Sequence, residues 1–447
     1  MARALAESNE PRPIVEEREL WQARMLSLLQ PEEEFRAGVP HERVALWKWL
    51  FAKTRTSGRQ KDMVLKLLCD GYKFPFVGTA EHLHKTQPKH RRKREQVINM
   101  LTKAGPKEGA PNMMTGVTPS EAYFPNHQSV LLEPGKALFK AEVEAGLKAN
   151  ILVEWPEGTR PWVVNPMSML TKEVAAGKLK HRLLIDPRYI NLFMEHCPVV
   201  YETLRDLAYT LWPGDLLMVF DDKSGFNHIP IHPEHWGYLG VECEGRYFAY
   251  THLPFGVAPG PMVYTMVKQQ MYAPLRALGV RLAFLIDDTC AAEVTEERAR
   301  RLCEVLLLIM TALGFNVGIK KSDFVPGHCK RFLGMMVDAL KQTFAVPLDK
   351  VVAFKELLAE RRAQLHITPM QIAQVAGKMV AMSVAVPLAM TLARSIAKAI
   401  RMDAVNKNWK ALWPKEDAMM EDWDIFEQLL THHNGLKHWP AVSHSTS

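Results

Sequence analysis

The sequence LLMVFDDKSGFNHIPI, residues 216–231, joins a short apolar run to two consecutive aspartates. The segment RLAFLIDD, residues 281–288, repeats this arrangement. Apolar runs of this length are typical of buried strands. A carboxylate at the end of a buried strand is costly unless it is solvated, paired or bound to a metal ion. We therefore expect a specific environment for the acidic groups that follow both strands.

Two interpretations of these aspartates follow from the residues alone. An Asp-Asp pair after a strand is most often a plain turn, because aspartate favours turn geometry. If the two sites lie on neighbouring strands, however, Asp221 and Asp287 can bind hard divalent cations through their oxygens. Two Mg²⁺ ions about 3.5–4 Å apart activate an attacking hydroxyl and stabilise a leaving phosphate oxygen. Such a site would carry out phosphoryl transfer, which depends mainly on positioning and electrostatics.

The composition is that of a soluble globular protein and argues against several other classes. Lys and Arg outnumber Asp and Glu by 56 to 49, which permits an anionic partner without requiring one. The six cysteines are irregularly spaced, which argues against a zinc ribbon or a disulfide framework and for a reducing compartment. No signal peptide is evident, and the most apolar stretch, 375–393, is interrupted by Lys378 and Pro387. We expect an intracellular protein, cytoplasmic or nuclear, without a membrane span.

Strands and helices alternate irregularly along the chain, which favours an α+β architecture over a doubly wound sheet. Residues 1–60 are predicted to be helical, and the basic run within 84–109 is interpreted as a solvated arm, a nucleic-acid contact or a nuclear-import signal. A helix is expected from Gly135, and a hairpin around the loop 171–182. The remaining predicted elements are a strand at 331–337 and helices at 302–315, 349–365 and 368–400, the last with Thr368 as its N-cap.

Six motifs surround these aspartates in a fixed order. The first two are HRLLIDPRYIN (181–191) and FDDKSGFNHIPI (220–231). They are followed by LPFGVAPGPMVY (253–264), FLIDD (284–288), LGFNVGIKKS (313–322) and FLG (332–334), and then by the helical segment ITPMQIAQVAGKM (367–379). In this order and with these gaps, residues 126–400 resemble the reverse transcriptase family.

This resemblance implies a right-hand polymerase fold, with fingers, an antiparallel palm sheet flanked by helices, and a helical thumb. The implied activity is that of an RNA-directed DNA polymerase, a nucleotidyltransferase that extends a primer with dNTPs on an RNA or DNA template. The implied domains are an N-terminal polar and basic helical extension with a linker (1–125), fingers and palm (126–345), the thumb (346–400) and a C-terminal helical connector (401–447) in which no RNase H is evident.

The resemblance also implies roles for individual residues. Asp221, Asp287 and Asp288 are the expected catalytic ligands of two Mg²⁺ ions, which Mn²⁺ can replace. The expected nucleotide-binding residues are Lys172, Arg182, Phe226, Phe255, Gly256 and Lys321. The expected template–primer residues are Asp186, Arg188, Asn191, Pro261, Leu285 and Gly334. Thumb residues expected to contact phosphates, and so to make duplex binding salt-sensitive, are Lys350, Lys355, Arg361, Arg362, Lys378 and Arg394.

The segments GYKFPF (71–76) and NHQS (126–129) make the chain most similar to the DIRS-type, tyrosine-recombinase retrotransposons. In the family the third motif consists of LPFG, then any three residues, then Ala-Pro, then any two residues, and finally Phe. The chain departs from the family at several places, none of which removes a metal ligand. They include Asp222 for a hydrophobic residue, Leu285 for Tyr or Phe, Gly260 for Ala, and Gly318 for Asn.

Two alternatives stay open. One is a catalytically decayed or domesticated nucleic-acid-binding remnant, against which the three intact aspartates argue. The other is an RNA-dependent RNA polymerase, which shares the palm. Phe226 argues against it, because in the family this position lies under the sugar and blocks a 2′-hydroxyl. The oligomeric state is not predicted.

Overall fold

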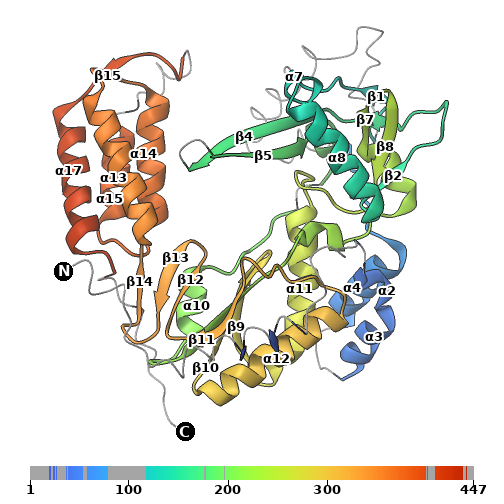
Figure 1. Ribbon diagram of the computed structural model, residues 1–447, viewed down its shortest axis with the longest axis horizontal. Coiled ribbons are helices and arrows are strands. Elements are labelled where there is room, and N and C mark those ends of the chain that lie inside the picture. Colours follow the sequence, from blue (N-terminus) through green and yellow to red (C-terminus); the bar gives the residue numbers. More distant parts are fainter. Residues whose placement is uncertain are drawn as a thin grey trace.

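The computed structural model describes residues 37–78 and 117–435, with gaps at 38, 54–57, 176–177, 196, 399 and 401–407, together with Trp439 and a few residues of 20–27. The basic run within 84–109 lies outside the described residues. The described chain has the shape of a U, in which a helical bundle and a mixed α/β lobe stand on either side of a central sheet (Figure 1).

The central sheet has four strands in the order β11-β6-β10-β9, each antiparallel to its neighbours. These strands are β6 (Leu216–Asp221), β9 (Arg281–Leu285), β10 (Asp288–Glu293) and β11 (Asp323–Gly327). The two apolar runs thus form β6 and β9, as predicted. Two long helices, α11 (Gly260–Ala277) and α12 (Glu296–Ala312), pack on the sheet (Figure 1).

Both faces of this sheet are apolar. Met218 and Phe220 of β6 belong to a core shared with the α/β lobe, whereas Leu217 and Val219 belong to a core shared with the helical bundle. Successive side chains of a strand point to opposite faces. A strand buried on both faces therefore has a continuous apolar sequence instead of an alternating one, which explains the run LLMVF.

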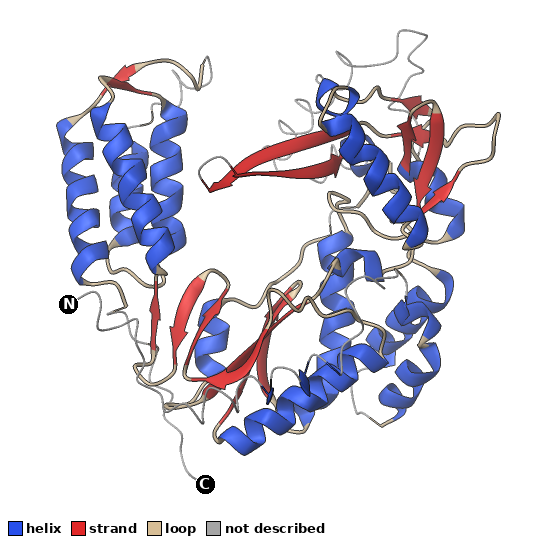
Figure 2. Ribbon diagram, viewed as in Figure 1, coloured by secondary structure: helices blue, strands red, loops and turns tan. Residues whose placement is uncertain are grey.

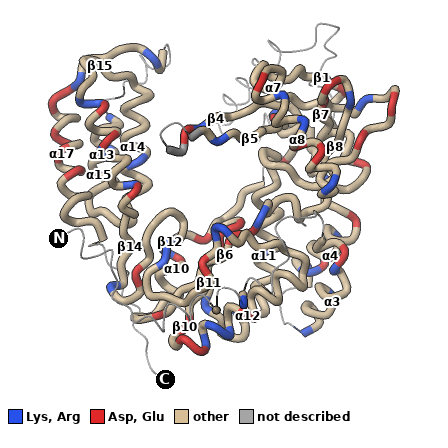
Figure 3. Tube along the Cα trace, viewed as in Figure 1, with Lys and Arg blue, Asp and Glu red and all other residues tan. Residues whose placement is uncertain are grey.

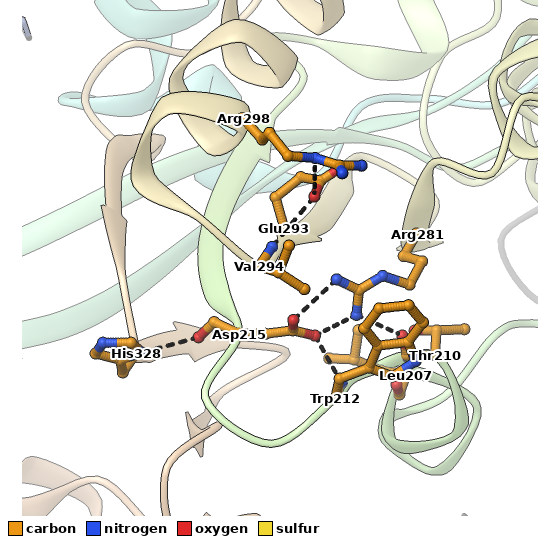
Figure 4. Close-up of polar contacts among 9 residues, drawn as sticks. All are labelled: Leu207, Thr210, Trp212, Asp215, Arg281, Glu293, Val294, Arg298 and His328. Atoms are coloured by element: carbon orange, nitrogen blue, oxygen red, sulfur yellow. Dashed lines mark hydrogen bonds and ion pairs between the residues drawn. The ribbon is translucent and has the colours of Figure 1, made fainter. Parts of the chain in front are cut away.

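A buried ion pair fixes the end of the sheet that lies away from Asp221 (Figure 4). Asp215, just before β6, is fully buried, and Arg281 at the start of β9 donates to both of its carboxylate oxygens. The guanidinium also lies 4.1 Å from the centroid of the Trp212 ring. This pair ties the chain before β6 to the start of β9, so the strands that lead to the aspartates keep a fixed alignment.

The α/β lobe corresponds to the predicted fingers. Its sheet has the order β1-β3-β7-β8-β2. The strands are β1 (Ala122–Tyr123), β2 (Leu152–Glu154), β3 (Val163–Val164), β7 (Gly240–Cys243) and β8 (Arg246–Tyr250). The helix predicted from Gly135 is α8 (Gly135–Lys148), which follows α7 (Gln128–Leu131). The predicted hairpin pairs β4 (Met167–Ala175) with β5 (Lys178–Ile185) and extends toward the helical bundle (Figure 2). The prediction of a loop over 171–182 was wrong, because most of these residues lie in the paired strands.

Shorter elements connect the lobe to the central sheet, and N-terminal helices pack beside α11. The connecting elements are α9 (Arg188–Asn191), α10 (Leu204–Thr210), η2 (Gly225–His228) and η3 (Pro233–Leu239). The N-terminal helices are α2 (Val39–Glu42), α3 (Val44–Ala52) and α4 (Gly58–Asp70). The helices α2 and α3 confirm the helical prediction for the described part of 1–60. The helix α4 contacts α11.

A small three-stranded sheet leads to the helical bundle. Its strands are β12 (Cys329–Phe332), β13 (Met335–Asp338) and β14 (Thr343–Ala345). The bundle contains α13 (Leu348–Ala363), α14 (Pro369–Met382), α15 (Ala389–Lys398) and α17 (Asp417–His432). The strands β15 (His366–Ile367) and β16 (Trp413–Pro414) pair at the far end of the bundle (Figure 1).

Thr368 caps α14 as predicted, because its hydroxyl accepts from Gln371 N and the Gln371 side chain accepts from Thr368 N. The prediction of one helix over 368–400 was wrong. The chain leaves the helical path between Met382 and Ala389, where Pro387 cannot continue a helix.

Two further segments differ from their predictions. The segment 331–337, predicted as one strand, is divided by a tight turn in which Leu333 has φ 45° and Gly334 has φ 74°. In the segment predicted as a connector, α17 packs against α13 and α15 and shares their apolar core. Among the described residues, no helix is both long and apolar enough to cross a bilayer.

Candidate active site

The carboxylates of the two apolar runs meet at one edge of the central sheet. Asp221 is the last residue of β6 and Asp288 the first of β10, and the two are direct cross-strand partners. Asp287 lies in the tight turn between β9 and β10, and its carbonyl accepts from Asp222 N at 3.0 Å. The sheet register alone therefore brings all three predicted ligands to the same edge.

The backbone is strained beside both acidic segments. Ile286, which precedes Asp287, has φ 54°, and Ser224, three residues after Asp221, also has φ 54°. A β-branched residue rarely adopts positive φ, and such outliers cluster at functional sites. The turn at Ile286 directs β10 back along β9, and the turn at Ser224 returns Phe226 toward α11.

The site is electrostatically unfavourable for three carboxylates without a cation. Burial, followed by the neighbouring Asp287 and Asp221, raises the pKa of Asp288 to about 6. Burial is also the main cause of the raised pKa of Asp221 and of Asp287. Buried acidic oxygens that raise one another's pKa are suited to a hard divalent cation, which reverses this effect.

Lys321 supplies the nearest positive charge. Its Nζ lies 3.0 and 3.1 Å from the two carboxylate oxygens of Asp221. Burial acts to lower the pKa of Lys321, but Asp221 and the other aspartates raise it overall, so the ammonium stays protonated. Among the described residues, no three acidic, histidine or cysteine side chains are grouped closely enough to hold a metal as they stand. Lys321 would have to release Asp221 for a cation to bind there.

Gly318 is one of the departures from the family motifs, and the structure gives a reason for it. A Cβ at this position would lie 2.7 Å from Asp221 Oδ2. Gly318 N also donates to Asp221 O at 2.7 Å, and Ser322 Oγ accepts from Asp221 N at 2.9 Å. The close approach of the 318–322 loop to Asp221 therefore excludes a side chain at position 318.

Three of the predicted nucleotide-binding residues lie together beside Asp221. The Phe226 ring is 94% buried, and its centroid lies 4.9 Å from that of Phe255, which is half exposed. Gly256 has φ 98°, which only glycine adopts readily, and a Cβ there would lie 3.1 Å from Pro187 Cδ. Glycine at 256 thus lets this loop pack closely against Pro187.

The other two, Lys172 and Arg182, lie on the β4–β5 hairpin. In the register Lys172 faces Lys180 and Arg182 faces Leu170, so these side chains share one face. All three basic residues are exposed. Lys and Arg positions lie along the β4–β5 hairpin (Figure 3). The sequence reasoning missed Lys180, although its spacing of two residues from Arg182 places both side chains on the same side of a strand.

The comparisons with known proteins agree with this arrangement. Residues 167–337 match the family model for reverse transcriptase (RNA-dependent DNA polymerase). The chain therefore contains a reverse transcriptase domain. Its matched region includes both acidic segments, the β4–β5 hairpin and the loop that carries Lys321.

Two viral polyproteins are relatives of this reverse transcriptase domain. The genome polyprotein of petunia vein clearing virus is 26% identical over 164 residues, which cover 36% of this chain and 7% of that protein. The Pro-Pol polyprotein of simian foamy virus type 1 is 22% identical over 182 residues, covering 40% of this chain and 15% of that protein. The chain thus matches only a small part of each. Because these relatives are viral, the DIRS-type assignment stays a prediction.

Solved structures share the fold of most of the chain. A foamy viral protease–reverse transcriptase in complex with an RNA/DNA hybrid aligns with a TM-score of 0.59 at 15% identity, covering 92% of this chain and 48% of that chain. A second, in complex with dsDNA, gives a TM-score of 0.56 at 15% identity, covering 91% and 74%. The predicted α+β, right-hand polymerase fold is confirmed.

The residues predicted to bind template and primer in this reverse transcriptase domain have different environments. Arg188 is exposed and forms an ion pair with Asp186, whose carboxylate accepts from Arg188 Nε. Asn191 instead donates to Gly256 O at 2.8 Å and accepts from Ala258 N at 2.9 Å. Its amide supports the loop that carries Phe255 and Gly256, so we assign it a supporting role.

The remaining predicted template–primer residues lie at turns and element ends. Pro261 is in the first turn of α11, and Leu285 is the cross-strand partner of Asp288. Gly334 lies in the β12–β13 turn, where its carbonyl accepts from Lys350 Nζ at 2.7 Å. Gly334 has φ 74°, which favours glycine, and its missing Cβ leaves room for this ammonium group.

Two of the predicted phosphate contacts of the bundle need correction. Arg362 forms ion pairs with Asp424 and Glu427 of α17, and Arg361 is 92% buried beside Glu360. Both cations therefore stabilise the bundle and are not available to a duplex. Lys378 on α14 and Arg394 on α15 are exposed.

Proposed function

We propose that this chain is an RNA-directed DNA polymerase of a retroelement similar to the DIRS-type elements. It extends a nucleic-acid primer with dNTPs by two-metal phosphoryl transfer. The observation that carries this proposal is the cross-strand pairing of Asp221 with Asp288, with Asp287 in the adjoining turn. Three partly buried acids at one edge of the sheet form a donor set that suits hard divalent cations.

Asp221, Asp287 and Asp288 would hold two Mg²⁺ ions, which Mn²⁺ can replace. When bound, the ions activate the primer 3′-hydroxyl and offset charge on the triphosphate. Lys321, once it has released Asp221, can give its proton to the departing pyrophosphate. Phe226 presents an apolar ring to the sugar, which leaves a 2′-hydroxyl without space or a hydrogen-bond partner.

We also propose the domain organisation given above, with fingers and palm in 126–345 and a thumb that begins at 346. An RNA or DNA template–primer duplex would lie across the sheet between hairpin and bundle. Its contacts would be with phosphates, and the exposed Lys378 and Arg394 support this. The exposed position of Arg188 supports a role for it at the template backbone.

Primer extension on poly(rA)/oligo(dT) tests this proposal. The native chain is expected to incorporate dTTP with Mg²⁺ or Mn²⁺ and to stop when EDTA is added. Equal extension with ribonucleotides would favour an RNA-dependent RNA polymerase instead. Duplex binding without any metal-dependent extension would favour the decayed or domesticated remnant.

The basic face of the hairpin gives a prediction about nucleotide affinity. Changing Lys172 or Arg182 to alanine is expected to lower kcat/KM for dTTP by about 10–100-fold, because a charge-assisted contact contributes about 1.5–3 kcal/mol. The loss should lie mainly in KM, measured by steady-state incorporation. His181→Ala, on the opposite face of β5, is the matched control and should change kcat/KM by less than about two-fold. Equal losses in all three variants would contradict the assignment.

Duplex binding gives a second prediction. Lys378→Ala is expected to weaken binding of any duplex sequence and to reduce the slope of log K against log salt concentration by about 1. Fluorescence anisotropy at several salt concentrations measures this slope. Arg362→Ala is the control, because Arg362 is paired within the bundle, and its slope should equal that of the native chain. A native slope in Lys378→Ala would remove Lys378 from the interface.

A further inference from the structure

A chain of buried polar groups connects α11 to both acid-bearing strands. Tyr264, Lys268 and Tyr272 are four residues apart on one face of α11, and all three are fully buried. Lys268 Nζ lies 2.6 Å from Asp222 Oδ2, and the Tyr264 hydroxyl donates to the same oxygen. The Lys268 ammonium also lies 4.9 Å from the centroid of the Tyr272 ring.

This cluster contacts the candidate site without opening into it. Asp222 follows Asp221 directly, and its N–H donates to Asp287 O. The Tyr264 ring lies edge-on against Phe226, with centroids 5.6 Å apart and planes at 88°. A Cβ at Gly225 would lie only 3.1 Å from the Tyr264 ring. The cluster thus contacts the Asp287 backbone through Asp222 and the Phe226 ring through Tyr264.

Two departures from the family motifs meet in this cluster. The motifs have a hydrophobic residue at the position of Asp222 and Phe at the position of Tyr264. Here both residues are polar and share a hydrogen bond, and Lys268 compensates the carboxylate charge. A buried ion pair is often no more stable than the apolar packing it replaces. The pair is better explained by geometry, because two buried donors that share one carboxylate oxygen fix each other's orientation.

We propose that Asp222, Lys268 and Tyr264 form a positioning network that sets discrimination against ribonucleotides. Asp222 Oδ2 binds the ammonium and the hydroxyl together, so the Tyr264 ring cannot rotate or retreat into α11. The Tyr264 ring then packs against the Phe226 ring and holds it in position when a 2′-hydroxyl contacts it. None of the three residues contacts the substrate. This inference rests on the proposed polymerase function.

Lys268→Met leaves Asp222 without its counter-charge and tests the network. The ratio of kcat/KM for dTTP to that for UTP on poly(rA)/oligo(dT) is expected to fall by about 10-fold or more, as for a loosened steric contact. Tyr264→Phe keeps the ring and removes only the hydroxyl, and should lower the ratio by about 2–10-fold. The triple variant Asp222→Val, Tyr264→Phe, Lys268→Met restores apolar packing and should return the ratio to within about three-fold of native.

Arg281→Met is the matched control, because it breaks the buried ion pair with Asp215 at the other end of the same sheet (Figure 4). Both Lys268→Met and Arg281→Met are expected to lower the melting temperature by about 5–15 °C. Only Lys268→Met should change the dTTP/UTP ratio. If Lys268→Met does not fold, the milder Tyr264→Phe variant decides the question.

The outcomes separate this inference from the proposed function. A native ratio in both Lys268→Met and Tyr264→Phe, with dTTP incorporation intact, would overturn the positioning role and leave the polymerase proposal standing. An equal fall of the dTTP/UTP ratio in Arg281→Met would mean that loss of stability, and not loss of the network, causes the change. Absence of dTTP incorporation by the native chain would overturn the proposed function and this inference with it.

Discussion

Replacing Asp287 with asparagine is expected to lower the rate of dTTP incorporation by about 10³-fold or more. A metal ligand at this site contributes several kcal/mol of transition-state stabilisation, and each 1.4 kcal/mol corresponds to about a tenfold change in rate. Asparagine keeps the size of the side chain but removes the negative charge that the cation requires. Single-turnover primer extension with Mg²⁺ measures the loss.

The fold of this variant should be intact. Burial raises the pKa of Asp287, so its charged form is disfavoured in the folded protein without metal. The neutral amide relieves this cost, and metal-free Asp287→Asn should unfold at the same temperature as the native chain or a higher one. Thermal unfolding with EDTA checks this and separates loss of catalysis from loss of structure.

Glu293→Gln is the matched control for Asp287→Asn. Glu293 is the last residue of β10, at the opposite end of the strand from Asp288, where it pairs with Arg298 (Figure 4). Its replacement should change incorporation by less than about two-fold, because it removes an ion pair at the end of β10 farthest from Asp288. Equal incorporation by the native chain and Asp287→Asn would end the catalytic assignment.

The fold was predictable wherever one segment of sequence carried enough information. The apolar runs at 216–220 and 281–286 suit strands of a covered sheet. The acids that follow them lie at one end of this sheet, but β10 separates β6 from β9, so the two runs are not the neighbouring strands that the hypothesis assumed. The break in the helix predicted over 368–400 was also visible in the sequence as Pro387. Its effect was underestimated, because the apolar periodicity continues on both sides of it.

The partners of charged residues were much harder to predict. Arg361 and Arg362 were expected at the duplex because exposed cations on a thumb helix suit phosphates. The acidic partners of Arg362 on α17, Asp424 and Glu427, lie more than sixty residues away in sequence. Only tertiary packing brings such groups together. No local pattern separates a cation that binds phosphate from one that stabilises a bundle.

At Lys268 the sequence itself indicated a buried acidic partner. A lysine at the centre of an apolar stripe on α11, four residues from Tyr264 and four from Tyr272, requires a buried counter-charge. Asp222 was recognised as a departure from the motif, but its partner lies 46 residues further on. The two anomalies explain each other only when β6 and α11 are packed together.

Phe226→Ala is expected to lower the selection of dTTP over UTP by about 10–200-fold, the range for removing apolar bulk from a fitted pocket. The ring is almost fully buried between Phe255 and Tyr264, so its removal opens space for a 2′-hydroxyl. Incorporation of dTTP should fall much less than that selection, measured as separate kcat/KM values. Phe324→Leu, in the buried core of β11, is the control and should keep the native ratio.

The double variant Phe226→Ala, Lys268→Met extends this prediction. If Lys268 acts through the support of the Phe226 ring, its replacement has nothing left to disturb once that ring is absent. The double variant should then show the ratio of Phe226→Ala alone, because contacting residues in one network are not additive. A further tenfold fall would mean that Lys268 influences ribonucleotide selection by a route independent of Phe226.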